Sequence, residues 1–257
     1  MAKALLRPRL VKWYGWRPDL PDVRDRKLAI TAPPALPDHV DLRDQCPPVY
    51  DQGQLGSCTA NAIAAALEFD QKKQGLKEFT PARLYIYYNE RVIEGTVGQD
   101  AGAQIRDGIK SVNKVGAPPE NEWPYKISIF TRKPSPKAYR DGKKHPAVQY
   151  ASVAQTLPQL QGALAQGLPF VFGFSVYESF ESNEVSNTGE VPLPGVDEQL
   201  LGGHAVLAVG YDNASSRFIV RNSWGTDWGL KGYFTMPYDY LTNNDLADDF
   251  WTIQSTK

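Results

Sequence analysis

Residues 51–69 read DQGQLGSCTANAIAAALEF, and this stretch determines the predicted fold. A loop containing Gly53 and Gly56 leads to Cys58, after which alanine and larger apolar residues recur at helical spacing as far as Gly75. Unpaired N–H groups and a partial positive charge at a helix N-terminus lower the pKa of a thiol toward the reactive thiolate. Cys58 is therefore a candidate nucleophile, with a structural cysteine at a helix start as the alternative.

Two residues from the second half of the chain extend this site. His204 opens the apolar run AVLAVGYD after Gly202 and Gly203, and it follows Cys58 by 204 − 58 = 146 positions. Asn222 ends the predicted strand RFIV, 222 − 204 = 18 positions further on. Two adjacent strands joined by a turn would place the Asn222 amide oxygen beside the imidazole N–H of His204. We therefore expect Asn222 to orient the ring.

Gln52 and Trp224 are expected to complete the site. Gln52 lies in the glycine-containing loop before Cys58, and its amide together with the Cys58 N–H would form an oxyanion hole. The alternative for Gln52 is a buried side chain that satisfies loop carbonyls. Trp224 is placed to shield the hydrogen bond between His204 and Asn222 from water.

The chain divides into three parts by pattern. Residues 1–38 carry six prolines without an apolar period, which predicts an extended arm. The remaining domain, residues 39–257, has a mostly helical half at about 50–150 and a mostly β half at about 151–257. Helices are expected over residues 58–75, 80–94, 102–115 and 157–167, and strands in PFVFGFSVY, HAVLAVGYD, RFIVRNSWG and GYFTMPYDY.

Composition excludes several classes of function. With 28 basic and 29 acidic side chains, the chain has no overall field that attracts nucleic acid or an anionic membrane. Two cysteines and three histidines predict neither a disulfide framework nor a structural metal, and Cys46 is expected to be a free loop thiol. The start lacks the apolar segment of a secretory signal, so we expect a cytoplasmic protein, with export by another route left open. Asp245, Asp248 and Asp249 are expected to form a solvated acidic face.

At residues 38–257 the sequence resembles the papain-like cysteine peptidases. The blocks 51–58, 203–206 and 222–233 (NSWGTDWGLKGY) are similar to the family's glutamine–cysteine, histidine and asparagine segments, and 40–43 and 122–125 also match in order. The spacing from Cys58 to His204 lies within the range of roughly 130–150 residues typical of papain-type enzymes. The segment GWRPDLPDVRD at 15–25 points to bacterial members.

This resemblance implies an α+β, two-lobe fold with a helical lobe, an antiparallel β-barrel-like lobe and an active-site cleft between them. It implies a cysteine endopeptidase in which the Cys58 thiolate, paired with the His204 imidazolium, attacks a peptide carbonyl and forms an acyl-enzyme. It also implies no cofactor or metal, a monomer acting on peptides or proteins, and no nucleic-acid or membrane partner. The residues expected to bind substrate are Gly102 and Ala103 by their backbone, Ile105 and Ala205 beside a pocket for an apolar side chain, and Gly203 and Trp224.

The sequence departs from the family at three positions. Leu55 and Asp100 stand where members commonly carry a disulfide pair, and Thr59 replaces a tryptophan, so the first helical turn must be packed differently. The arm is too short for the usual helical pro-domain, and we expect it either to lie near the cleft and limit access or to pack on the back of the fold. Two other functions stay open: acyl transfer by a ligase or transamidase, and a silent peptide-binding module.

Overall fold

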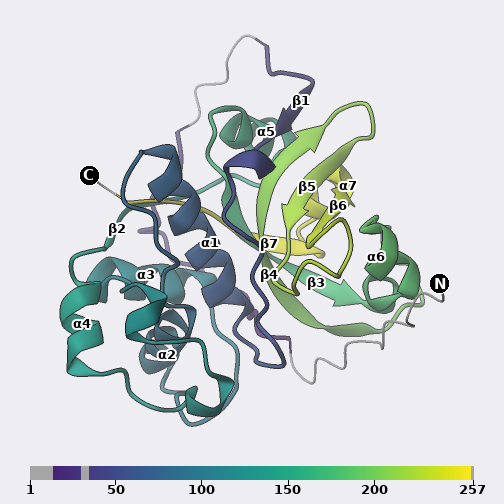
Figure 1. Ribbon diagram of the computed structural model, residues 1–257. Helices are drawn as coiled ribbons and strands as arrows, with labels where there is room; N and C mark the ends of the chain where they lie inside the picture. The colour runs from purple at the N-terminus through teal and green to yellow at the C-terminus, as the bar shows by residue number, and fades with distance from the viewer. Residues whose placement is uncertain (1–13, 30–34, 256–257) are drawn as a thin grey trace, which may run out of the picture.

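Helix α1 (Cys58–Lys73) lies between the helical half and the sheet in the computed structural model, which describes residues 14–29 and 35–255 (Figure 1). It packs against α2 (Arg83–Glu94) and α3 (Ile105–Val115), and also against β4 (Leu200–Asp212) and β7 (Ala247–Ser255). Every residue of α1 from Cys58 to Gln71 is buried. Its alanines suit this position, because short side chains let neighbouring elements approach the helix from all sides.

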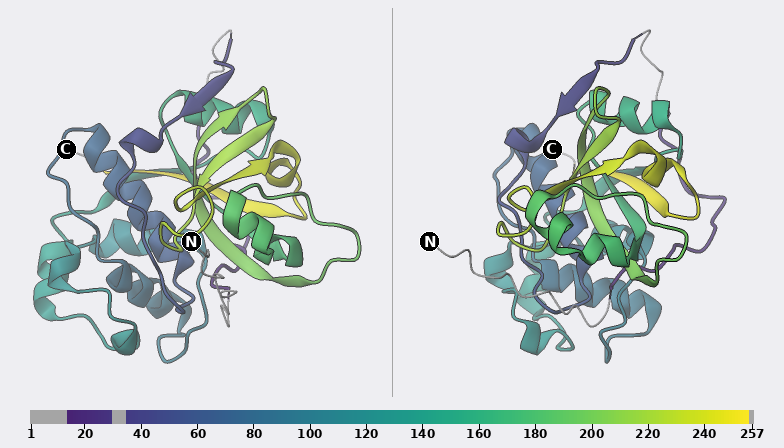
Figure 2. Two further views of the ribbon diagram at one scale, coloured as in Figure 1. Left: turned by 45° about the vertical axis from the view of Figure 1, so that its right-hand side comes forward. Right: turned by 90° about the vertical axis from the view of Figure 1, so that its right-hand side faces the viewer.

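One antiparallel sheet of seven strands forms the other half. Its order is β2 (Ala147–Ser152), β7, β3 (Phe170–Tyr177), β4, β5 (Arg217–Arg221) and β6 (Tyr233–Pro237), and β1 (His39–Asp41) also pairs with β4. The end strands β2 and β6 do not pair with each other within the described residues. The expectation of a barrel-like lobe is therefore corrected to an open, strongly curved sheet, while the two-part α+β architecture is confirmed (Figure 2).

Four short helices complete the fold. They are α4 (Pro136–Gly142) in the helical half, and α5 (Leu157–Ala165), α6 (Asn183–Thr188) and α7 (Tyr238–Thr242) on the side of the sheet, accompanied by four 3₁₀ turns at 43–45, 120–122, 127–129 and 178–181 (Figure 1). Hydroxyl groups of Ser135 and Ser182 accept backbone N–H groups at the starts of α4 and α6. No helix in the described part of the chain is long and apolar enough to cross a bilayer.

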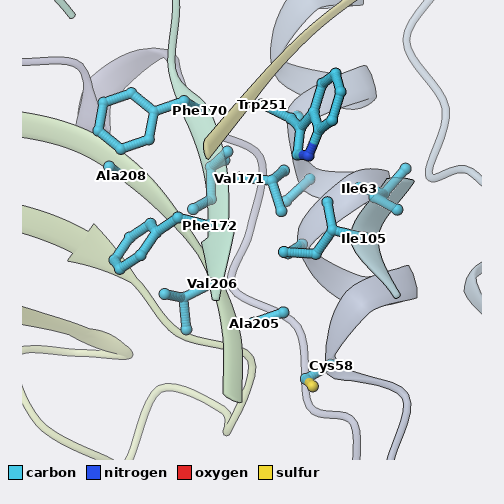
Figure 3. Packing of buried hydrophobic residues seen from close by; sticks show 14 of the residues in the cluster. Cys58, Ile63, Ile105, Phe170, Val171, Phe172, Ala205, Val206, Ala208 and Trp251 are labelled. Atoms are coloured by element: carbon cyan, nitrogen blue, oxygen red, sulfur yellow. The ribbon is translucent and has the colours of Figure 1, made fainter. Parts of the chain in front are cut away.

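Strand β3 separates two parts of the core. Val171 points toward α1, whereas Phe170 and Phe172 point to the opposite side of the sheet (Figure 3). There Phe172 stacks on Phe250 of β7 with ring centroids 5.5 Å apart. Because both faces of the strand are covered, its burial is almost continuous, as its unbroken apolar sequence indicates.

The observed elements agree with most of the sequence-based boundaries. The four expected helices are present with ends shifted by a few residues, and the expected strands at 169–177 and 204–212 are present as β3 and β4. The run GYFTMPYDY is only half strand, because the ladder ends at Pro237 and α7 follows. Strands β2 and β7 were not expected. The proposed division at 38, 150 and 257 stays a prediction.

We expect the substitution Phe172→Ala to lower the free energy of unfolding by about 3–5 kcal/mol, because it opens a cavity beside Phe250 in a fully buried aromatic cluster. Denaturant unfolding followed by circular dichroism measures this change. The control Val196→Ala removes a fully exposed side chain and should alter stability by less than about 0.5 kcal/mol. Equal stability of the two variants would contradict the packing described for β3.

Candidate active site

Cys58 is the first residue of α1 and is completely buried. It lies close to Ala205 of β4, the residue that follows His204 (Figure 3). Burial raises the pKa of the Cys58 thiol to about 12, and the charge of Glu90 acts in the same direction. Backbone N–H groups of Ala205, Gly15 and Thr59 act against this and lower the pKa. Desolvation therefore outweighs the lowering of the Cys58 pKa that the helix N-terminus was expected to cause.

His204 is oriented by Asn222. The His204 Nε2 and Asn222 Oδ1 atoms are 2.9 Å apart, and both residues are buried. The pairing of β4 with β5 produces this contact, since Asn222 directly follows the last residue of β5. The indole of Trp224 stacks on the imidazole at a centroid distance of 4.9 Å and covers the pair. The predicted contact and its predicted cover are both present.

Gln52 links the loop before Cys58 to the segment after β5. Its Nε2 donates to the Leu55 carbonyl at 2.9 Å, and its Oε1 accepts the Ser223 hydroxyl at 2.6 Å. The Gln52 backbone N–H also donates to the Ser223 carbonyl. These bonds fix the side chain, which is buried, beside the segment that carries Asn222. The Gln52 side chain therefore satisfies one loop carbonyl, that of Leu55, while its second amide hydrogen is still available for other contacts.

Arm residues 14–17 pass between the helical half and the sheet at this point. The Ala103 N–H donates to the Gly15 carbonyl at 2.7 Å, and the Arg17 N–H donates to the Ala103 carbonyl at 3.1 Å. From the other side, the Trp16 N–H donates to the Gly203 carbonyl at 2.9 Å. The arm backbone thus bridges Ala103 and Gly203, two of the residues expected to bind substrate.

The Trp16 side chain is buried against β3 and β4. Gly173 and Gly203 leave room for it: a Cβ atom at either position would lie within 2.5 Å of the indole. The Trp16 Nε1 donates to Asp249 Oδ2 at 2.9 Å, and only 7% of the side chain is exposed. The expectation that Asp249 is solvated is therefore wrong, because a β-bulge in β7 directs its carboxylate inward, whereas Asp245 and Asp248 are exposed.

Asp19 of the arm lies against Asp249. The Asp19 N–H donates to Asp249 Oδ2, while the Asp19 carboxylate accepts the Trp251 indole N–H and the Arg106 backbone N–H. Burial raises the pKa of Asp249 to about 7 and that of Asp19 to about 6. The charge of Asp19 raises the Asp249 pKa further, whereas Arg106 lowers that of Asp19. Two carboxylates this close repel each other, so the protonated form of the pair is favoured.

Other expected site residues lie around the arm. Gly102 approaches the Gly15 carbonyl closely, since a Cβ atom on Gly102 would lie 2.2 Å from that oxygen. Ile105 begins α3 and is buried in the core (Figure 3). In place of the family's disulfide, the Asp100 carboxylate accepts the Gly56 N–H at 3.0 Å and the Tyr87 hydroxyl.

The described residues contain no group of three or more His, Cys, Asp or Glu side chains that could hold a metal ion. Both cysteines are free thiols, and Cys46 is partly buried with its thiol directed at the Leu42 carbonyl. Sequence reasoning missed Trp16, Asp249 and Glu90 as neighbours of the site. The only sequence signal for Trp16 is that this large apolar residue lies in the arm, outside the predicted peptidase domain.

Comparisons with known proteins agree on one family. The family model described as papain family cysteine protease matches residues 36–250. The structure of xylellain, a cysteine protease from Xylella fastidiosa, is similar with a TM-score of 0.91 and 46% identity, covering 99% of this chain and all of that one. An uncharacterised peptidase C1-like protein of Acanthamoeba polyphaga mimivirus is 45% identical over 92% of this chain and 81% of its own length. A cathepsin B-like protein of Giardia intestinalis is 32% identical over 77% of this chain and 68% of its own.

We expect the free energy of unfolding to fall as pH rises from about 4 to about 7, because the folded state holds a proton on Asp249 that the unfolded chain has already lost. Asp249→Asn keeps an acceptor for Trp16 but removes this titration. The difference in stability between pH 5 and pH 8 should therefore shrink by more than about 1 kcal/mol in this variant. Denaturant unfolding at both pH values tests this, with exposed Asp245→Asn as the control. Parallel curves for wild type and Asp249→Asn would contradict the expectation.

Proposed function

Because this chain belongs to the papain family and is a cysteine-type peptidase, we propose that Cys58 is its nucleophile and that His204, oriented by Asn222, is its acid and base. The observation that carries the proposal is the buried hydrogen bond between His204 and Asn222 on a strand whose next residue, Ala205, contacts the Cys58 sulfur. No other nucleophile among the described residues stands beside an oriented imidazole.

Each group has a definite task in the proposed endopeptidase reaction. The Cys58 thiol gives its proton to His204, and the thiolate attacks the carbonyl carbon of the peptide bond. The oxyanion that forms is stabilised by the Cys58 N–H and by the available amide hydrogen of Gln52. His204 then protonates the leaving amine, and it later takes a proton from the water that hydrolyses the thioester. Asn222 accepts the second imidazole N–H throughout and keeps the ring in place.

Substrate is proposed to pair with the groups that the arm engages. Ala103 offers both its N–H and its carbonyl, and Gly203 offers its carbonyl, to an extended backbone. Gly102 leaves room for that backbone, and Ile105, Ala205 and Trp224 surround the site as apolar walls. The burial of the Trp16 indole against Gly203 supports a preference for large, mainly apolar side chains.

The arm is proposed to limit access to the cleft. Gly15 and Trp16 occupy hydrogen-bonding groups on both sides of it, and the Gly15 N–H faces the Cys58 sulfur. Desolvation of the thiol is one result, since Cys58 is completely buried with the arm in place. Departure of the arm would return water to Cys58 and lower its pKa toward the thiolate form. A cytoplasmic location and a monomeric state stay predictions from the sequence.

Cys58→Ala should abolish hydrolysis of peptides under reducing conditions, with kcat/KM at least about a thousandfold lower, because no other group replaces the nucleophile. The rate is measured with a fluorogenic peptide library, which also reports selectivity, and with labelling by a thiol-directed epoxide. Cys46→Ala is the matched control and should keep activity and label. Labelling at Cys46 with an unreactive Cys58 would sink the proposal in favour of a silent peptide-binding module.

Trp16→Ala should raise the kcat/KM of the full-length chain at least about fivefold, because a buried aromatic side chain that anchors the arm is lost. Steady-state hydrolysis of one peptide at several concentrations gives the change. The control is Leu20→Ala, which removes a mostly exposed arm side chain and should leave the rate unchanged. If the arm merely packs on the domain, Trp16→Ala and wild type should hydrolyse the peptide at the same rate.

A further inference from the structure

A buried carboxyl group lies behind the nucleophile and has no task in the reaction above. Glu90 projects from the second half of α2 and is completely buried. Its Oε1 accepts the hydroxyl of Thr59 at 2.7 Å. Thr59 is the residue after Cys58, at the position where the family carries a tryptophan. The Thr59–Glu90 bond therefore ties the first turn of α1 to α2.

Space for this carboxyl group is created by α3. A Cβ atom on Gly108 would lie 2.6 Å from Glu90 Oε2 and 2.4 Å from the Ile63 side chain. A glycine within a helix costs about 1 kcal/mol relative to alanine, so close approach is a physical reason for it here. The two helices and Gly108 together enclose the Glu90 carboxyl group.

The enclosed carboxyl group has no countercharge in contact. Glu90 Oε2 has no hydrogen-bond partner among the described residues, and no described cation forms an ion pair with Glu90. The neighbouring Arg91 directs its guanidinium to the carbonyls of Val97, Gln99 and Phe130. An unpaired carboxylate in a dry interior is strongly unfavourable, so the group is held as the neutral acid.

The charged and titratable groups around Glu90 agree with a neutral acid near neutral pH. Burial raises the pKa of Glu90 to about 8, and Asp107 of α3 raises it further. The Thr59 hydroxyl, Arg91 on the same helix and Arg17 of the arm lower it. Tyr87, one turn earlier on α2, has its pKa raised in part by the charge of Glu90.

The connection to Cys58 has two components. The Thr59 backbone N–H faces the Cys58 sulfur, so the side-chain bond to Glu90 fixes the residue that supplies this N–H. A negative charge on Glu90 raises the pKa of Cys58 directly. The neutral acid therefore supports the thiolate, whereas its conjugate base opposes it.

We propose that Glu90 is a positioning residue for Cys58: enclosed between α2 and Gly108 of α3, its carboxyl group anchors the first turn of α1 through Thr59, and a negative charge on it opposes the reactive thiolate. This inference rests on the proposed role of Cys58 as nucleophile. Glu90→Gln retains an acceptor for Thr59 and nearly the same shape but cannot ionise.

The test is the second-order rate of Cys58 alkylation by iodoacetamide between pH 5 and pH 10 in the full-length chain, with kcat/KM for a peptide measured in parallel. Above pH 8 the reactivity of wild type should rise less steeply than that of Glu90→Gln, because ionised Glu90 opposes the Cys58 thiolate. Glu90→Gln should match wild type within about threefold at pH 6–7 and exceed it by more than that at pH 10. Superimposable profiles would overturn the proposal.

Glu68→Gln is the matched control, since it makes the same change at another buried glutamate, which lies on α1 roughly 15 Å along the helix from Cys58. Its profile should follow wild type, and any effect of pH on the arm is common to both variants. A shift in Glu68→Gln equal to that in Glu90→Gln would also overturn the proposal.

Thr59 provides a second test that does not require Glu90→Gln to fold. Thr59→Val should lower the alkylation rate at pH 7 about tenfold, and Thr59→Ser should restore it, because serine keeps the hydroxyl donor. An unchanged rate in Thr59→Val contradicts the role of the anchor. Alkylation reports thiol reactivity without peptide cleavage, so an inactive peptidase with an altered alkylation profile would refute the proposed function and leave this inference standing.

Discussion

Burial of α1 between the helices and the sheet is the constraint on which the site depends. The helix is covered on every side from Cys58 to Gln71, so its first residue cannot move relative to β4 without disturbing the core. The register of β4 with β5 in turn brings Asn222 to His204. Neither half of the molecule contains the whole site. The contact between the N-terminus of α1 and the Ala205 backbone joins the two contributions.

A site assembled this way is sensitive to what lies between the halves. The arm residues lie between the halves with backbone hydrogen bonds to Ala103 and Gly203, and Cys58 is completely buried with the arm in place. The same hydrogen-bonding groups are proposed to receive substrate, so arm and substrate compete for them. Trp16 adds a side-chain hydrogen bond to the buried Asp249, so the arm is held by a specific contact as well as by its backbone.

The sequence predicted the parts of this arrangement that local patterns encode. Cys58 was found from the helix it begins, and His204 and Asn222 from the strands they adjoin, because helical and strand periodicities are properties of neighbouring residues. The position of the arm has no such signal, since extended proline-rich backbone carries no period. Asp249 was misjudged because a bulge, invisible in the sequence, turns one residue of an acidic segment inward. Glu90 was missed because charged residues surround it in NERVIE, which is typical of a solvated helix face.

The buried acids beside the arm (Asp19 and Asp249) and the buried acid behind the nucleophile (Glu90) have opposite expected effects on activity. Ionisation of Asp19 and Asp249 sets two negative charges against each other beneath Trp16, and this weakens the proposed seal as pH rises. Ionisation of Glu90 works in the other direction, because it opposes the Cys58 thiolate once the arm has left. The energetic origin is the same in each case, since a carboxylate removed from water must find a donor or remain protonated.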